Sequence, residues 1–66
     1  MSAEEMRSFC QSISPYQLRV QVRLKDQHEI LFGRILSVEP DRFRIMTDEK
    51  EVKDLRYAWV ARIKNA

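Results

Sequence analysis

The sequence predicts a mostly β protein, in which an N-terminal α-helix precedes a five-stranded, strongly bent antiparallel small barrel. Three observations support this fold class. The spacing of apolar residues changes from a period of about 3.6 before Pro15 to a period of about 2 after it. The chain's one glycine, Gly33, falls inside an apolar run, and polar turn residues recur at short intervals. We expect a single domain over residues 1–66, with the helix at about residues 3–14 and the barrel at about residues 17–65.

The helix is predicted from its cap and from its apolar face. Ser2 and Glu5 have the spacing of a capping box, in which each side chain satisfies a backbone N–H of the first turn. The apolar residues that follow recur at the spacing of one helical face: Met6, Phe9, Cys10 and Ile13. We expect the helix to end near Ser14, because Pro15 disfavours a helical conformation in the residue before it. So short a helix needs a surface to cover.

The first strand is predicted from strict alternation between residues 17 and 25. Its apolar positions are Leu18, Val20, Val22 and Leu24. The residues between them are polar, so one face of this strand is expected in the core and the other in solvent. Among the polar positions, Arg19, Arg23 and Lys25 form a cationic row that has two interpretations, a solvated face or a track for phosphates.

The other four strands are bounded by turn residues. Residues 30–38 predict a long second strand, and its internal Gly33 indicates a bulge or a bend where the sheet curls. The third strand is expected at residues 42–47, the fourth around Val52 and Leu55, and the fifth at residues 60–64. The short segment 57–59 allows only a tight turn. We expect the strands to close into a barrel, because closure removes exposed sheet edges.

The composition limits what can stabilise so small a core. A chain of this length buries little surface and usually needs a disulfide, a metal or association with other chains. Cys10 is the only cysteine and His28 the only histidine, so an internal disulfide and a zinc site are excluded. We therefore expect a homo-oligomer. The free thiol and the lack of a long apolar run predict a cytoplasmic protein with no membrane contact and no cofactor.

No catalytic constellation is present, so we do not expect an enzyme. The lone cysteine lies in the apolar helix stripe, where a buried thiol is inert, and His28 falls in a predicted turn. The formal net charge is only +2, and the excess of cations lies in residues 34–66, which hold eight Lys/Arg against six Asp/Glu. Such an imbalance is compatible with an anionic partner.

Several short strings resemble the Sm-like proteins, and in particular their bacterial Hfq branch. The spacing of helix, breaker and first strand from Phe9 to Leu24 is similar to that of Hfq, as are the strings at residues 41–46 (DRFRIM) and 55–58 (LRYA). Arg56 and Tyr57 stand where the family has lysine and histidine, so we expect a divergent relative. The resemblance implies a cyclic ring, commonly a hexamer or heptamer, in which the fourth strand of one subunit pairs with the fifth of the next.

The candidate RNA-binding residues are two pairs of a cation and an aromatic residue. In the first pair, Phe43 would stack on a base beside Arg42, although alternation also allows Phe43 to lie in the core. In the second pair, Arg56 and Tyr57 lie in the turn that the resemblance places at the ring's pore. Tyr57 has the alternative of packing on Trp59 or on its neighbours. Trp59 is itself expected in the core or at a subunit interface.

The function expected from these observations is binding of single-stranded RNA, uridine-rich or adenine-rich, by a homo-oligomeric ring. The resemblance implies Hfq-like post-transcriptional regulation or RNA chaperoning. An alternative is an SH3-like small barrel that contacts protein without binding RNA, since one fold serves both uses. A ribosome-associated or other accessory factor of the same barrel class fits the composition equally well.

Overall fold

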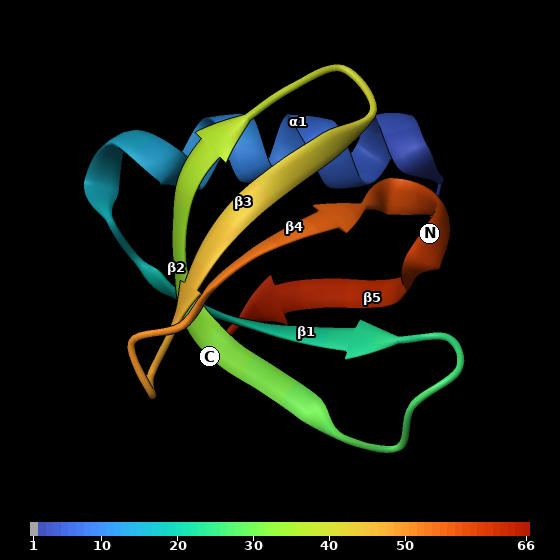
Figure 1. The fold of residues 1–66 in the computed structure, drawn as a ribbon. Coiled ribbons are helices and arrows are strands. Elements are labelled where there is room, and N and C mark those ends of the chain that lie inside the picture. The colour runs from blue at the N-terminus through green and yellow to red at the C-terminus, as the bar shows by residue number, and fades with distance from the viewer. Residues whose placement is uncertain (1) are drawn as a thin grey trace.

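A computed structural model describes residues 2–66, and it confirms a helix followed by five antiparallel strands (Figure 1). The elements in chain order are α1 (Ala3–Ile13), the 3-10 turn η1 (Ser14–Tyr16), β1 (Arg19–Leu24), β2 (Ile30–Val38), β3 (Arg42–Thr47), β4 (Val52–Arg56), the 3-10 turn η2 (Tyr57–Trp59) and β5 (Val60–Asn65). The second and third strands have the predicted bounds, and the helix ends one residue before the expected Ser14.

The helix α1 begins with the predicted capping box. The Ser2 hydroxyl accepts a hydrogen bond from the backbone N–H of Glu5 at 3.1 Å, and the Glu5 carboxylate accepts one from the backbone N–H of Ser2 at 3.2 Å. The helical conformation continues past Pro15 for one 3-10 turn, because proline fits the first turn of η1. The direction changes at Gln17 instead, where the backbone takes a left-handed φ of 54°.

The strands form one sheet in the order β4-β3-β2-β1-β5, and β2 is the strand that bends it. The first half of β2 pairs with β1 and the second half pairs with β3. Gly33 lies in both pairings, opposite Val20 on one side and Thr47 on the other. The predicted bend is therefore present, but the bulge falls between Ile35 and Ser37 rather than at the glycine. Gly33 instead allows the backbones of β2 and β3 to approach closely.

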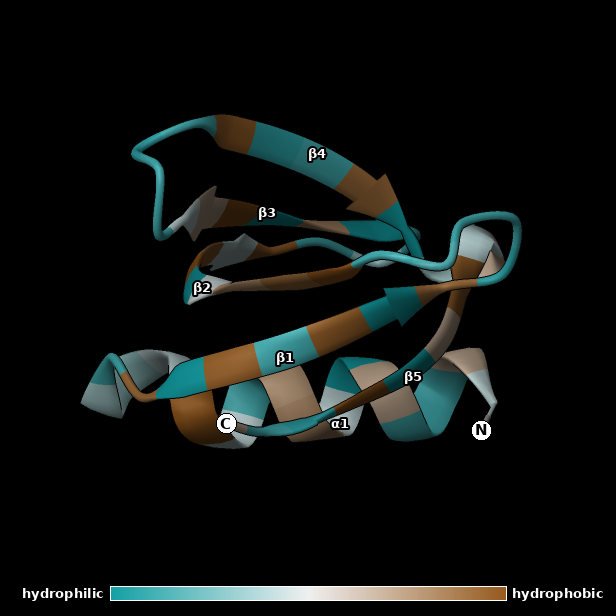
Figure 2. Ribbon diagram, turned by 90° about the horizontal axis from the view of Figure 1, so that it is seen from below, coloured by the Kyte–Doolittle hydropathy of each residue, from teal (hydrophilic) through white to brown (hydrophobic). Residues whose placement is uncertain are grey.

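The core lies between α1 and the concave side of the bent sheet. Figure 2 shows the alternation of apolar and polar residues along β1, whose Val20 and Val22 are fully buried. The helix contributes three of its four predicted apolar residues as buried side chains, and Phe9 packs at the margin. The other buried apolar side chains are Ile35, Phe43, Ile45, Leu55, Tyr57, Val60 and Ile63. Leu18, which was expected on the apolar face of the first strand, precedes β1 and is exposed.

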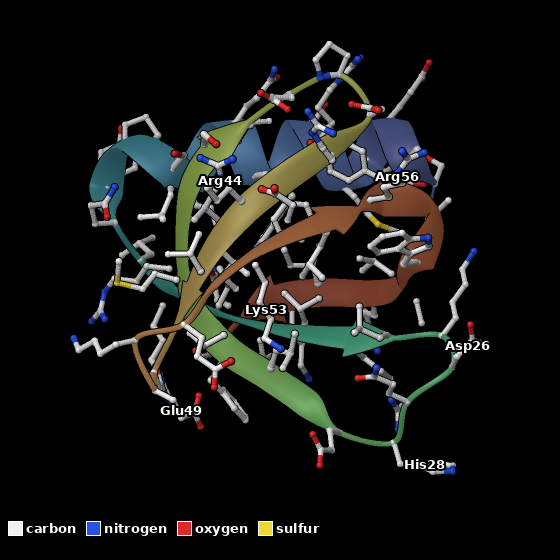
Figure 3. All side chains as sticks on the ribbon, viewed as in Figure 1. Asp26, His28, Arg44, Glu49, Lys53 and Arg56 are labelled. Atoms are coloured by element: carbon white, nitrogen blue, oxygen red, sulfur yellow. The ribbon has the colours of Figure 1, made fainter. Side chains whose placement is uncertain are left out.

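Hydrogen bonding does not close the barrel, because β4 and β5 are the two edges of the sheet and do not pair with each other in residues 2–66. We call the space between these two edges the open seam. Lys53 stands opposite Ile45 in the β3–β4 register, so it belongs to the side of β4 that faces the core. In Figure 3 the Lys53 side chain extends from β4 in the direction of β5 and β1. The edge strand thus carries an inward-facing cation at the open seam.

Candidate nucleic-acid interface

The first predicted cation–aromatic pair does not form a binding surface. The guanidinium of Arg42 donates a hydrogen bond to the Glu39 carboxylate at 2.7 Å, so its charge is already paired. Phe43 points to the other side of β3, where only 1% of it is exposed. Of the two interpretations of Phe43, core packing is the one that this structure shows, because a ring buried in this way offers no face to a nucleobase.

The second pair is divided between the core and the surface. Tyr57 is buried and stacks on Phe43, with ring centroids 5.6 Å apart and planes 27° from parallel. Its hydroxyl donates a hydrogen bond to the carbonyl oxygen of Glu39 at 3.1 Å, and burial raises the pKa of this hydroxyl to about 12. Of the two interpretations of Tyr57, packing is the one that this structure shows, with Phe43 as the aromatic partner. Its role in this structure is to hold the β2–β3 turn against η2.

Arg56 lies on the surface, next to the ring of Trp59. Its guanidinium lies 6.0 Å from the centroid of the Trp59 ring, within the range of a cation–π interaction. Trp59 is 52% exposed, so of its two expected positions the core is wrong, and the subunit interface stays a prediction. The reason is local: Val60, immediately after η2, takes the core position opposite Leu24. Exposed tryptophan beside arginine is a pairing suited to stacking on a flat ligand.

A second cationic surface lies on the outer side of β1 and β5. Arg23 pairs in register with Arg62, and Gln21 pairs with Lys64, so these four side chains alternate away from the core. Together with Ile30 of β2 they surround a hollow of about 150 Å³. We call this surface, made of Gln21, Arg23, Ile30, Arg62 and Lys64, the β1–β5 face. The cationic row predicted along the first strand therefore contributes Arg23, while Arg62 and Lys64 come from β5.

The cations of the β1–β5 face have no carboxylate partner within residues 2–66, unlike Arg19, Arg42 and Arg44. Arg19, which lies on β1 like Arg23, forms a salt bridge with Asp48, and its guanidinium lies 4.7 Å from the centroid of the Phe32 ring. On β3, Arg44 donates to Asp54 at 2.8 Å. The hydrogen bonds from Arg19 and Arg44 hold the pKa values of both carboxyls below their usual range. Three cations without an ion pair, Arg23, Arg62 and Lys64, therefore lie together on the β1–β5 face.

The cationic arrangement of the β1–β5 face is suited to binding anions. Burial raises the pKa of the Cys10 thiol to about 12, so it is neither a thiolate nor accessible at neutral pH. Across residues 2–66, no three His, Cys, Asp or Glu side chains gather as ligands for a metal ion. No helix in this part of the chain is long and apolar enough to cross a membrane.

Comparisons with known proteins do not add an identification. None of the models of known protein families matches the sequence, and no curated protein matches it either.

Proposed function

We propose that this protein binds single-stranded RNA as a ring of identical subunits, with the β1–β5 face of each subunit contacting the phosphate backbone. The observation that carries the proposal is the convergence of three unpaired cations, Arg23, Arg62 and Lys64, around one hollow. Unpaired guanidinium and ammonium groups neutralise phosphates without first breaking an ion pair, and counterion release then drives binding.

A protein that binds single-stranded RNA also needs apolar or aromatic surface, because the unstacked bases of the RNA are exposed and can pack on it. The β1–β5 face includes Ile30, of which 41% is exposed, and Trp59 lies at the end of η2 from which β5 begins. Each subunit offers few contacts. Repetition around a ring would make successive contacts intramolecular and raise the overall affinity, which suits a chain with a net charge of only +2.

The open seam supports association between copies through β4 and β5. Both edges present unpaired backbone groups along one side, and a neighbouring strand would satisfy them. Charge disfavours symmetric pairing of two β5 strands, since each carries Arg62 and Lys64 without a carboxylate. The edge strand β4 includes Asp54. It also includes Lys53 and Arg56, so charge alone does not select the partner of β5. Pairing of β4 with the β5 of the next copy joins two different edges, and repetition of this head-to-tail contact generates a ring if the rotation closes.

The test is the salt dependence of RNA binding, which fluorescence anisotropy of labelled single-stranded homopolymers measures. The double variant Arg62→Ala/Lys64→Ala should bind less tightly and lower the slope of log K against log salt by about 1.4, since each phosphate contact on a single strand contributes about 0.7. Lys50→Ala is the matched control, because Lys50 is exposed and unpaired but lies on the β3–β4 turn. Equal slopes in the two variants would place the RNA elsewhere, and no binding at low salt would refute the proposal.

A protein-interaction module is the second candidate, and the free edge of β4 favours it. A strand from another protein could add to β4 through backbone hydrogen bonds alone. Light scattering separates the two functions. A closed ring that binds RNA supports the first, and a monomer that binds no RNA supports the second.

A further inference from the structure

A hollow of about 200 Å³ lies beside Trp59, at the end of the barrel where β1 turns toward β2. We call it the Trp59 hollow, and its lining residues are Leu24, Asp26, Gln27 and Trp59. It is separate from the β1–β5 face, with which it shares no lining residue. It combines an aromatic wall, an aliphatic side chain and two hydrogen-bonding side chains in one place. This is the composition of a site for a flat, polar ring.

The aromatic wall is held by the sheet. The carbonyl oxygen of Trp59 accepts a hydrogen bond from the backbone N–H of Lys25 at 2.9 Å, which ties η2 to the end of β1. The Arg56 guanidinium lies over the indole ring and adds a positive charge next to it. About half of Trp59 nevertheless remains exposed. An exposed indole with a fixed backbone binds a stacked base at a low cost in conformational entropy.

The hydrogen-bonding wall comes from the β1–β2 turn. Asp26 and Gln27 are both exposed, and within residues 2–66 neither side chain makes a hydrogen bond or an ion pair. Figure 3 shows Asp26 on the same side of the barrel as Arg56. The carboxylate is a pure acceptor with two oxygens, whereas the amide of Gln27 both donates and accepts. Both groups are available to a ligand that stacks on Trp59.

We propose that the Trp59 hollow binds one unpaired guanine base, stacked on Trp59 and hydrogen-bonded through its Watson–Crick edge to Asp26. This inference rests on the proposed RNA-binding function and names the base recognised next to the phosphate-binding face. It departs from the uridine-rich or adenine-rich RNA expected at the sequence level.

The preference for guanine follows from the chemistry of the carboxylate. Guanine presents two adjacent donors, N1–H and the N2 amino group, which match the two oxygens of Asp26 in a bidentate contact. Adenine and cytosine each present one amino group beside an acceptor nitrogen, which would repel the second carboxylate oxygen. Uracil presents one N–H between two carbonyl oxygens. The carbonyl O6 of guanine, in contrast, can accept a hydrogen bond from the Gln27 amide.

The chain contains its own reporter, because Trp59 is the only tryptophan. We expect the four ribonucleoside 5′-monophosphates to quench its fluorescence when they stack on it, with excitation where tyrosine does not absorb. The phosphate is common to all four, so differences between them report the base. GMP should bind roughly 5- to 100-fold more tightly than UMP, the discrimination expected of one bidentate contact. Free N-acetyltryptophanamide corrects for absorption by the nucleotides.

Two pairs of variants test the roles of the residues. Asp26→Asn exchanges one acceptor for a donor and should bring GMP and AMP to within about threefold of each other. Glu29→Gln is the matched control, since Glu29 is an exposed acid of the same turn that lines a different hollow. For binding of a labelled guanine-containing oligonucleotide, Trp59→Ala should weaken affinity at least about fivefold. Tyr16→Ala, which removes an aromatic residue that is 73% exposed, should not.

The outcomes separate this inference from the function on which it rests. If RNA binds with a steep salt dependence but GMP quenches no more than UMP, the guanine site is wrong and RNA binding stands. Equal loss of GMP binding in Asp26→Asn and Glu29→Gln would also overturn the site, because it would indicate a general charge effect. Absence of both RNA binding and quenching would refute both proposals.

Discussion

Replacement of Gly33 by alanine should destabilise the fold strongly, although alanine is ordinarily the better strand residue. A methyl group at this position would lie 2.9 Å from both the carbonyl carbon of Met46 and the Cα of Thr47, and closer still to the Met46 carbonyl oxygen. All three atoms belong to the backbone of β3, so no side-chain rotation relieves the contact. Strands β2 and β3 must then separate where β2 pairs with both its neighbours.

The size of the effect follows from two opposing contributions. Loss of chain flexibility in the unfolded state favours alanine by about 0.5–1 kcal/mol, whereas overpacking against a fixed backbone costs about 1–3 kcal/mol and occasionally more. The steric cost wins, and a net loss of about 1–2 kcal/mol lowers the melting temperature of a chain this small by roughly 5–15 °C. Thermal unfolding followed by circular dichroism measures the change.

Two further variants make the test specific to the close approach. Ser37→Ala, at an exposed position of the same strand, should melt close to the unmodified protein. Gly33→Ala/Met46→Ala should show no rescue, because the clash involves the Met46 backbone and not its side chain. A Gly33→Ala variant that melts with the unmodified protein would refute the reasoning.

Two other predictions concern titratable groups. Asp48 and Asp54 have pKa values lowered from 3.8 by hydrogen bonds from Arg19 and Arg44, so their contribution to stability is present above that pH and is lost as the pH falls through the lower, folded-state values. Urea unfolding midpoints should therefore stay level down to about pH 5 and then fall, and Asp48→Asn should flatten the decline. The buried Cys10 thiol, with its pKa raised to about 12, should react with a thiol reagent at neutral pH only after urea unfolds the protein. Rapid labelling of the folded protein would contradict its burial.

The fold was largely predictable because its signals are local. The capping box at Ser2 and the alternation through Val20 and Val22 depend on neighbouring residues, and the structure follows both. The single glycine correctly predicted the bend, but the sequence did not show why a glycine is required there. Close approach of two backbones depends on which strands become neighbours, so the location of the bulge after Ile35 was also missed.

The candidate site was less predictable, because exposure depends on tertiary packing. Alternation left Phe43 open to two interpretations, and only the contact with Tyr57 decides for the core. The core position allowed for Trp59 is wrong because the smaller Val60 fills it, although large aromatic residues are usually highly buried. The β1–β5 face joins residues about forty positions apart, Arg23 and Arg62, and no local pattern indicates that their strands pair. The sequence gives the number of these charges, but it does not show that they lie side by side in the folded protein.

The lysine on the core-facing side of β4, at the open seam, bears on which segments can pair with this free edge. An edge strand with free backbone groups invites unlimited addition of further strands, and a charged side chain on its buried side is one of the devices that prevent it. The Lys53 ammonium lies 3.9 Å from the Glu51 carboxylate, and both side chains are exposed. Any strand that docks along β4 must therefore leave this pair hydrated or supply hydrogen bonds to it, because burying charged groups without such bonds is costly. An apolar aggregating segment meets neither condition. Lys53 therefore makes the open seam selective, so that the free edge of β4 is not also a template for fibrils.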